Sequence, residues 1–379
     1  MSAGPVTSRS VALHALNRID EGAYANLVLP GLLDASPLDR RDRAFTTELV
    51  YGSTRMRRAL DFLIDRLVDR PLDADVRNIL RLGAYQVAFL RTPAHASVSA
   101  TVDLAPDRAR GFVNAVLRRL SREPAPRWPD PPTRLSYPDW VVRRLAADLG
   151  GPVAEAALEQ MNVSPEVTER ADGYIQDEAS QQVAAYVGAA AGERVADVCA
   201  APGGKATAMA SSGAALVVAG DHSPARSSVV AANVARLDLS NVAVVVADAA
   251  RPPLWPGSLD RVLVDAPCSG LGVLRRRPDA RWRIQPGDVE RLAALQRDLL
   301  DGAAGLVRPG GTLVYSVCTL TLEETQGIDA WLASAHPGLD PLPPPGAPWE
   351  PLGRGARLLP QAAGTDGMYV LGLRRQGGD

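Results

Sequence analysis

The chain has 379 residues, a length that suggests two or three domains. Hydrophobic residues make up 46% and charged residues 22%, which excludes a mainly disordered chain and indicates a folded protein with a core. The 41 basic and 43 acidic residues nearly balance, at a net charge of −2. No apolar run is long enough to cross a bilayer, and the first ten residues lack the apolar stretch of a signal peptide. We therefore expect a soluble, cytoplasmic protein.

Residues 1–122 predict a helical bundle, because apolar side chains recur at helical spacing and no stretch alternates as a strand would. Asp39 is placed to cap the second helix, and Gly83 to break a later one. This region carries 18 Arg against 13 acidic residues, a charge of +5, whereas the remainder carries −7. Its arginine clusters favour contact with RNA phosphates, although a solvated surface is an equally good explanation. These clusters are Arg40, Arg41 and Arg43; Arg55, Arg57 and Arg58; and Arg118, Arg119 and Arg122.

The central and C-terminal parts of the chain have different patterns. Residues 123–138 are rich in proline and predict a linker, and 139–162 predict a pair of helices. From about residue 177, short Val-rich runs alternate with helical segments, which predicts a mainly parallel sheet covered by helices on both faces. The expected strands are 195–198, 215–219, 242–247, 262–264, 312–315 and 368–373. The expected helices are 177–188, 204–212, 224–237, 288–307 and 322–335.

A glycine-rich turn follows the first expected strand. The segment Asp197-Val-Cys-Ala-Ala-Pro-Gly-Gly-Lys205 has two glycines, which let the backbone approach a ligand at the start of a helix. It is not a Walker A motif, because Cys199 stands where the first glycine is required and Ala206 follows the lysine. Lys205 is also the single lysine among 41 basic residues. A GC-rich coding sequence explains the bias to arginine, so the retained lysine suggests a need for a compact ammonium group.

Acidic residues follow the next strands and suggest the kind of ligand. In sheets of this type, ligands bind at the carboxyl ends of the strands. Asp221 is placed to accept from the hydroxyls of a ribose, and Asp248 from an adenine amino group. Each alone could be an ordinary surface aspartate, but together they point to an adenosine-containing ligand. Without a phosphate-binding loop, S-adenosyl-L-methionine fits better than a nucleoside triphosphate.

The three cysteines, Cys199, Cys268 and Cys318, do not suggest disulfides or a metal site, because their number is odd and no Cys-x-x-Cys pair exists. Each could simply be a small buried apolar residue. However, Cys268 and Cys318 follow neighbouring expected strands on the ligand side of the sheet. Thr321-x-x-Glu324 has the pattern of a capping box, which would place Cys318 beside a helix N-terminus. The helix dipole would then lower the thiol pKa, as a nucleophile requires.

These motifs resemble those of the RNA cytosine-C5 methyltransferases. The similar segments are the glycine-rich turn 197–205, Asp265-Ala-Pro-Cys268 and Ser316-Val-Cys318. In the N-terminal part, segments 42–52, 81–86, 93–96 and 111–119 are similar to the NusB-like RNA-binding domain, and 358–360 and 364–367 match the family's C-terminal strand region. The combination is typical of the bacterial small-subunit (16S) rRNA cytosine-C5 methyltransferases, the RsmB/Sun/Fmu family.

The resemblance implies a fold with two parts: an all-α NusB-like domain over 1–122, and a Rossmann-like S-adenosylmethionine-dependent α/β methyltransferase domain over 177–379, joined by a connector over 123–176. It implies that Cys318 is the nucleophile, that Cys268 assists product release, and that Asp265 and Lys205 line the pocket of the target base. It further implies that S-adenosyl-L-methionine is bound by Cys199, Ala200, Ala201, Pro202, Gly203, Gly204, Lys205, Asp221, Asp248 and Asp265. The expected substrate is a flipped or single-stranded cytidine of ribosomal RNA, bound by a monomer without membrane or DNA partners.

One departure from the family pattern concerns RNA binding. Relatives have a small RNA-binding subdomain with an Arg-x-Asn signature, whereas here only 163–175 separate Asn162 from Gln176, and Glu169-Arg-Ala171 stands in that area. Several dozen residues are therefore missing by this comparison. The missing segment keeps open an alternative interpretation, in which the protein is a non-catalytic RNA-binding or ribosome-assembly factor that retains the methyltransferase fold. A DNA cytosine methyltransferase is the second alternative, although that class attacks with the Pro-Cys cysteine and lacks the Ser-x-Cys one.

Overall fold

The computed structural model describes residues 6–90 and 92–377, so the outermost residues of the predicted domains, 1–5 and 378–379, lie outside the described residues. The chain forms two compact units that are discontinuous in sequence. The helical unit consists of Met1–Arg143, Asn162–Ser164 and Leu274–Arg283, and the sheet unit of Arg144–Met161, Pro165–Val273 and Ile284–Asp379. A segment that follows Cys268 in sequence thus belongs to the helical unit.

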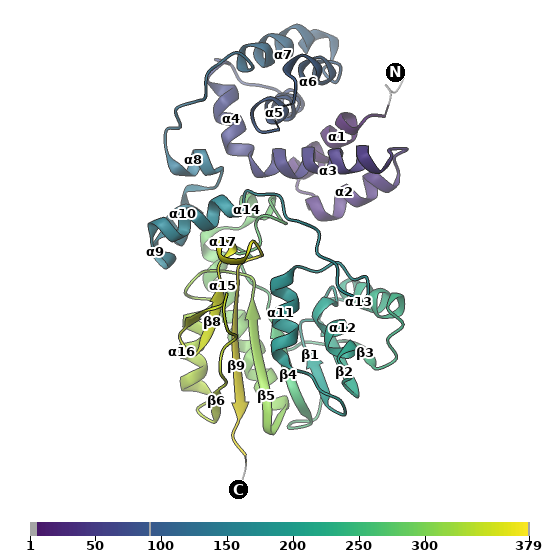
Figure 1. Cartoon of the computed structure of the whole chain (residues 1–379), viewed down its shortest axis with the longest axis vertical. Helices are drawn as coiled ribbons and strands as arrows, with labels where there is room; N and C mark the ends of the chain where they lie inside the picture. The colour runs from purple at the N-terminus through teal and green to yellow at the C-terminus, as the bar shows by residue number, and fades with distance from the viewer. Residues whose placement is uncertain (1–5, 91, 378–379) are drawn as a thin grey trace. The chain divides into compact units, whose positions relative to one another are not determined.

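The helical unit confirms the predicted bundle and adds helices that the apolar pattern did not reveal. Its principal helices, drawn in purple and blue in Figure 1, are α1 (Ser8–Asp20), α2 (Ala25–Asp34), α3 (Arg40–Arg55), α4 (Arg57–Asp65), α5 (Ala74–Ala88), α6 (Ala94–Val102) and α7 (Asp107–Leu120). The proline-rich stretch contains α8 (Pro131–Leu135), and the later segment supplies α14 (Ala280–Arg283). Fully buried leucines and isoleucines such as Leu60, Ile64, Leu80 and Leu117 form its core.

Two local predictions for these helices have different outcomes. Asp39 caps α3 as expected, because its side chain accepts a hydrogen bond from the backbone N–H of Asp42 at 2.8 Å. Gly83, in contrast, does not break its helix, and α5 continues to Ala88. The glycine serves packing, since a Cβ atom at this position would lie 2.5 Å from Leu117 Cδ1 of α7.

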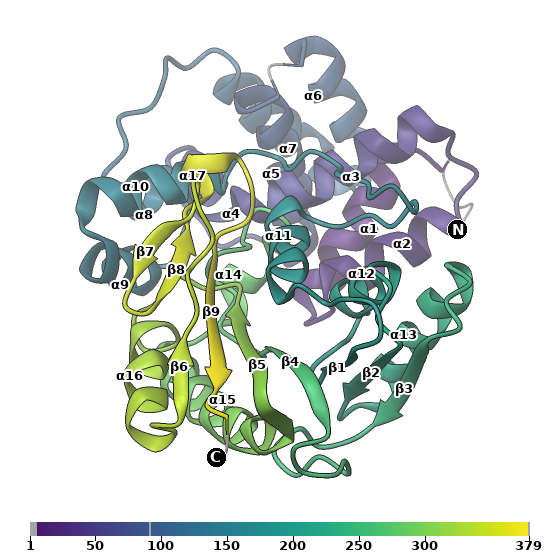
Figure 2. The same ribbon diagram turned by 60° about the horizontal axis from the view of Figure 1, so that its bottom comes forward.

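The sheet unit contains a mixed sheet and not the mainly parallel one predicted, because four of its described strand pairings are parallel and four are antiparallel. Figure 2 shows its strands side by side in the order β3-β2-β1-β4-β5-β9-β8-β7, with β6 beside β9. The first five strands of this order are parallel, and β9 is antiparallel to β5. The bounds are β1 (Arg194–Asp197), β2 (Leu216–Asp221), β3 (Val242–Val246), β4 (Leu259–Asp265), β5 (Val307–Val317), β6 (Leu339–Pro341), β7 (Glu350–Leu352), β8 (Gly355–Leu358) and β9 (Met368–Arg375).

Helices cover both faces of this sheet. On one face, α11 (Glu178–Val187), α12 (Gly204–Ser211) and α13 (Pro224–Arg236) pack against strand residues such as Val195 and Leu263. On the other face, α15 (Pro286–Leu306) and α16 (Gln326–Ala335) pack against residues such as Val264. The alternation of side chains along each strand explains why neighbouring residues belong to different cores. The remaining helices are α9 (Asp139–Leu149), α10 (Gly151–Gln160) and α17 (Pro360–Ala363).

The all-α and α/β classes predicted from the sequence are both confirmed. The expected strands and the helix pair of 139–162 are present, whereas β6, β7 and β8 were not predicted, because these short strands lack the continuous Val-rich runs that mark the others. Within the described ranges, no helix combines the length and apolar character needed to cross a membrane.

Candidate active site

The glycine-rich loop lies where the strand order reverses. From β1, the chain continues to β2 on one side, whereas β4 pairs with β1 on the other, and such a switch point is the usual ligand site of an open α/β sheet. Gly203 has a φ of +108°, a conformation that favours glycine. The N–H of Ala200 donates to the carbonyl oxygen of Gly220 at 2.7 Å, which ties the loop to the end of β2. The start of α12 is thereby presented at the carboxyl edge of the sheet.

Residues 170–176 pack over this loop, a feature that the sequence did not reveal. A Cβ atom on Gly204 would lie 3.2 Å from the ring of Tyr174, so glycine permits the close approach. Arg170 donates to the carbonyl oxygen of Gly204 and to the Thr207 hydroxyl, and its guanidinium lies 4.9 Å from the Tyr174 ring centroid. In the sequence, the segment Glu169-Arg-Ala171 was noted only because it stands where the family has its Arg-x-Asn signature. Only the fold shows that Arg170 contacts α12.

The acidic residues gather at the strand ends as predicted, with different surroundings. Asp197 and Asp221 are buried, at 1% and 3% exposure. Asp221 accepts from the backbone N–H of Ser223 at 3.0 Å and pairs with Arg226 at 3.2 Å. Asp248 lies two residues beyond β3, is exposed, and accepts from the backbone N–H of Ala250.

A narrow apolar slot lies beside these carboxylates. Val198, Gly220, Val245 and Leu254 are among its lining residues, and Asp197 forms part of its wall. Ala247 and Ala249, the two neighbours of Asp248, also line it. The slot has a volume of only about 20 Å³, so a flat group such as adenine would enter it only if the lining side chains moved apart.

Burial raises the pKa of Asp197 to about 7, and repulsion from the Asp265 carboxylate adds to this effect. The pKa is raised relative to the unfolded chain, so the unbound protein is stabilised through this group at low pH and loses that stability as pH rises towards 7. We expect the unfolding free energy of the wild type, relative to Asp197→Asn, to fall by up to about 1.4 kcal/mol per pH unit between pH 5 and 7. Urea unfolding of both proteins at each pH measures this difference. A difference that stays constant over this pH range would show that Asp197 is ionised throughout.

Lys205, which is buried, and Asp265, which is partly exposed, form an ion pair between α12 and the end of β4. The Nζ of Lys205 lies 2.7 Å from Asp265 Oδ2 and 3.4 Å from Ser180 Oγ, and Ser316 Oγ donates to Asp265 Oδ1 at 2.6 Å. Burial disfavours the Lys205 ammonium, but the Asp265 carboxylate more than offsets this and raises the lysine pKa. Lys205 therefore keeps its proton and presents a donor beside the oxygens of Asp265, which are acceptors.

Cys268 and Cys318 come together as expected, with their Sγ atoms 3.3 Å apart and both residues partly exposed. The hydrogen bond to Cys318, together with burial, raises the pKa of Cys268. Cys268 therefore retains its proton and can donate it to the sulfur of Cys318. Cys199 lies in the glycine-rich loop, where burial raises its pKa, so it remains a thiol.

The predicted capping box is wrong. Helix α16 begins at Gln326, eight residues after Cys318, so Cys318 is not beside its N-terminus. Glu324 is fully buried and accepts from the Ser269 N–H at 2.8 Å, from Gln296 Nε2 at 3.0 Å and from the Thr321 hydroxyl at 2.8 Å. These bonds connect the loop after Cys268 with the loop after Cys318. The sequence pattern shows that Thr321 and Glu324 interact but not that their partners lie on other elements.

Two family models match the chain. One, described as 16S rRNA methyltransferase RsmB/F, matches residues 185–374, and the other, described as NusB family, matches residues 6–122. The chain belongs to the 16S rRNA methyltransferase RsmB/F family. It is an RNA methyltransferase with an N-terminal NusB domain and a C-terminal domain of the S-adenosylmethionine-dependent fold.

Relatives of this RsmB/F protein match over nearly their full length. Ribosomal RNA small subunit methyltransferase B of Thermus thermophilus is 38% identical, over 97% of this chain and 98% of the relative. The protein of the same description from Pseudomonas putida is 34% identical, over 96% of this chain and 98% of the relative. That second alignment has 433 positions, more than the 379 residues here, so the relative has segments that this RsmB/F protein lacks. The predicted place of the missing segment, between Asn162 and Gln176, stays a prediction.

Solved structures show the same fold. The crystal structure of PH0851 has a TM-score of 0.80 and 21% identity, and it covers 98% of this chain and 99% of its own. A methyltransferase homologue from Pyrococcus horikoshii has a TM-score of 0.53 and 22% identity, covering 65% of this chain and 98% of its own. At these identities the structures establish the architecture of the RsmB/F protein and not its substrate.

Proposed function

We propose that this enzyme methylates C5 of a cytidine in small-subunit ribosomal RNA through a covalent bond between a cysteine and C6. The observation that carries the proposal is the pair of sulfur atoms of Cys268 and Cys318, 3.3 Å apart on the loops after β4 and β5. Lys205 and Asp265 form an ion pair at the same edge of the sheet. The relatives from Thermus thermophilus and Pseudomonas putida carry the name of a ribosomal RNA small subunit methyltransferase, which supports this substrate.

The residues around the glycine-rich loop suit S-adenosyl-L-methionine. The apolar residues of the slot can pack against its adenine beside Asp248 once the slot widens, and Asp221 can accept from its ribose hydroxyls. The unbound site concentrates the carboxylates of Asp197, Asp221 and Asp265, and their repulsion contributes to the raised pKa of Asp197. A cationic ligand would relieve this repulsion, and the sulfonium and ammonium groups supply such charge. The loop Cys199–Lys205 completes the proposed binding site together with these acids.

The need for a nucleophile follows from the electronics of cytosine, whose C5 is too weakly nucleophilic to take a methyl group directly. The Sγ of Cys318 adds to C6, which breaks the C5–C6 double bond and makes C5 nucleophilic. The bound donor supplies an electrophilic methyl group. Loss of the C5 proton and expulsion of the Cys318 thiolate then restore the aromatic ring.

The groups beside Cys318 can orient the target base and assist its release from the enzyme. Lys205 offers a hydrogen-bond donor and Asp265 an acceptor, which complement the carbonyl and amino groups of cytosine. The Cys268 thiol, which holds its proton beside Cys318, is placed to assist the elimination.

We further propose a role for each part of the chain. Residues 1–122 bind the RNA, residues 123–176 connect the two domains, and residues 177–379 carry out the reaction. The reaction takes place in the cytoplasm, where ribosomal RNA resides.

Bisulfite sequencing of ribosomal RNA tests the proposed reaction. We expect one cytidine of small-subunit RNA to lose its protection in a strain lacking this protein, and to regain it when the gene is restored. The purified enzyme, labelled methyl donor and protein-free RNA should yield 5-methylcytidine after nuclease digestion. Methylation at another base or another atom would refute the C5 assignment while leaving the family assignment intact.

The role of Asp221 is tested by its removal. We expect Asp221→Ala to weaken S-adenosyl-L-methionine binding about tenfold to a hundredfold, because a bond from a hydroxyl to a buried carboxylate is lost. Titration calorimetry measures the affinity, with Asp107→Ala as a control, since that side chain is 92% exposed on α7. An unchanged affinity would place the ribose elsewhere.

A further inference from the structure

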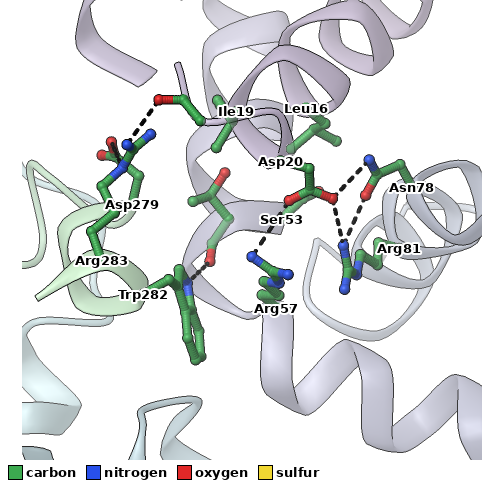
Figure 3. A pocket seen from close by; sticks show the side chains of 12 residues that line it. Leu16, Ile19, Asp20, Ser53, Arg57, Asn78, Arg81, Asp279, Trp282 and Arg283 are labelled. Atoms are coloured by element: carbon green, nitrogen blue, oxygen red, sulfur yellow. Dashed lines mark hydrogen bonds and ion pairs between the residues drawn. The ribbon is translucent and has the colours of Figure 1, made fainter. Parts of the chain in front are cut away.

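The helical unit contains a cavity that the proposed reaction does not use. It has a volume of about 200 Å³ and lies where α1, the end of α3, α5 and α14 meet (Figure 3). All its lining residues belong to the helical unit, although α14 follows Cys268 in sequence. Arg281 of α14 is fully buried and donates to the carbonyl oxygens of Arg55 and Ser136, so this segment is firmly held.

One wall of the cavity has an unsatisfied polar group. Ser53 is 1% exposed, and its Oγ has no hydrogen-bond partner among the residues that the structure describes. A buried hydroxyl without a partner destabilises the fold, and such groups are rare. A ligand in the cavity would supply the missing partner.

The charged groups of the cavity are paired with one another. Asp20 accepts from Arg81 at 3.0 Å and pairs with Arg57 at 3.4 Å, and Arg283 pairs with Asp279 at 3.4 Å (Figure 3). Arg81 also pairs with Asp61 at 2.7 Å, outside the lining, so the three arginines face three carboxylates, unlike those of a phosphate site. The cavity favours a neutral ligand that can form several hydrogen bonds.

The other walls of the cavity suit a flat ring. Leu16 and Ile19 supply apolar wall, and the indole of Trp282 is fixed by donation from Nε1 to the carbonyl oxygen of Thr54 at 2.8 Å. The Arg57 guanidinium lies 5.9 Å from the Trp282 ring centroid. Proteins bind unpaired RNA bases in this way, by stacking on aromatic or guanidinium planes and by hydrogen bonds to the base edges.

We propose that this cavity binds one unpaired base of the RNA substrate, other than the base that reacts at the cysteine pair. The proposal deepens the proposed function and rests on RNA being the substrate. Binding at this site would hold the RNA through recognition of a base, in addition to any phosphate contacts made by the surface arginines.

The test uses the full-length protein and protein-free small-subunit ribosomal RNA. We expect Ser53→Ala to weaken RNA binding about threefold to tenfold without lowering the free energy of unfolding, because the lost hydroxyl satisfies nothing within the protein. Ser99→Ala, on the exposed surface of α6, is the matched control. Trp282→Phe keeps a ring and should weaken binding less than Trp282→Leu does.

Photocrosslinking locates the base directly. Transcripts containing 4-thiouridine or 6-thioguanosine should crosslink to peptides that contain Ser53 or Trp282, as identified by mass spectrometry. The proposal is overturned if these variants bind RNA normally and crosslinks occur only in the sheet unit. It is also overturned if free ribonucleosides bind the cavity while Ser53→Ala leaves RNA affinity unchanged. Analysis of the methylated product is separate, so RNA held at this cavity but not methylated at C5 would refute only the proposed function.

Discussion

Cys318→Ala is expected to lower methyl transfer by about a thousandfold or more, because the variant cannot form the bond to C6 that makes C5 reactive. The measurement is single-turnover transfer of labelled methyl groups to protein-free small-subunit ribosomal RNA. The affinities for RNA and for S-adenosyl-L-methionine serve as internal controls and should stay within about twofold, since the sulfur removed is small and partly exposed.

The result also discriminates between the possible roles of the two sulfur atoms. If Cys318→Ala retained normal turnover and Cys268→Ala lost it, the nucleophile would be the cysteine after β4. If neither substitution lowered turnover, no covalent bond would be needed. The non-catalytic alternative requires that the wild type itself transfers no methyl group although it binds RNA.

Cys268→Ala is expected to accumulate a covalent complex of enzyme and RNA. The thiol of Cys268 lies 3.3 Å from the sulfur of Cys318, and its raised pKa keeps it protonated. It is therefore placed to assist the step in which Cys318 leaves the base, and without it the methylated adduct should persist. Denaturing gel electrophoresis with labelled RNA detects the adduct as a species of lower mobility.

The matched control is Cys268→Ala combined with Cys318→Ala, which should form no adduct. Nuclease digestion of the trapped complex followed by mass spectrometry should locate the nucleotide on the peptide containing Cys318. A Cys268→Ala enzyme that turns over normally and traps nothing would show that product release needs no second sulfur.

Features fixed by local physical chemistry were predictable. Asp39 caps α3 because a capping side chain bonds to the backbone only three residues away. The Val-rich strands and the acids after them follow from burial on both faces of a parallel sheet and from the position of its carboxyl ends. The closeness of Cys268 and Cys318 could be predicted because the strands before them, β4 and β5, were expected to be neighbours. The parallel pairing of β4 and β5 confirms that expectation.

Features that depend on contacts between distant segments were not predictable. The pattern at Thr321 and Glu324 resembles a cap, yet Glu324 bonds with Ser269 and Gln296, which lie on other elements. Gly83 has the appearance of a helix break, but its lack of a side chain makes room for Leu117. Nothing in the spacing of Arg170 indicates that it contacts the start of α12.

The sequence by itself determined the two fold classes and predicted the cysteine, lysine and aspartate residues of the candidate site. It did so because hydrophobic periodicity and turn motifs are properties of contiguous residues. Only the tertiary structure decided that α14 joins the helical unit, that Glu324 connects the two cysteine loops, and that Ser53 faces a cavity without a partner. Burial and hydrogen bonding of these groups depend on segments far apart in the chain, and no local pattern records which segments will meet.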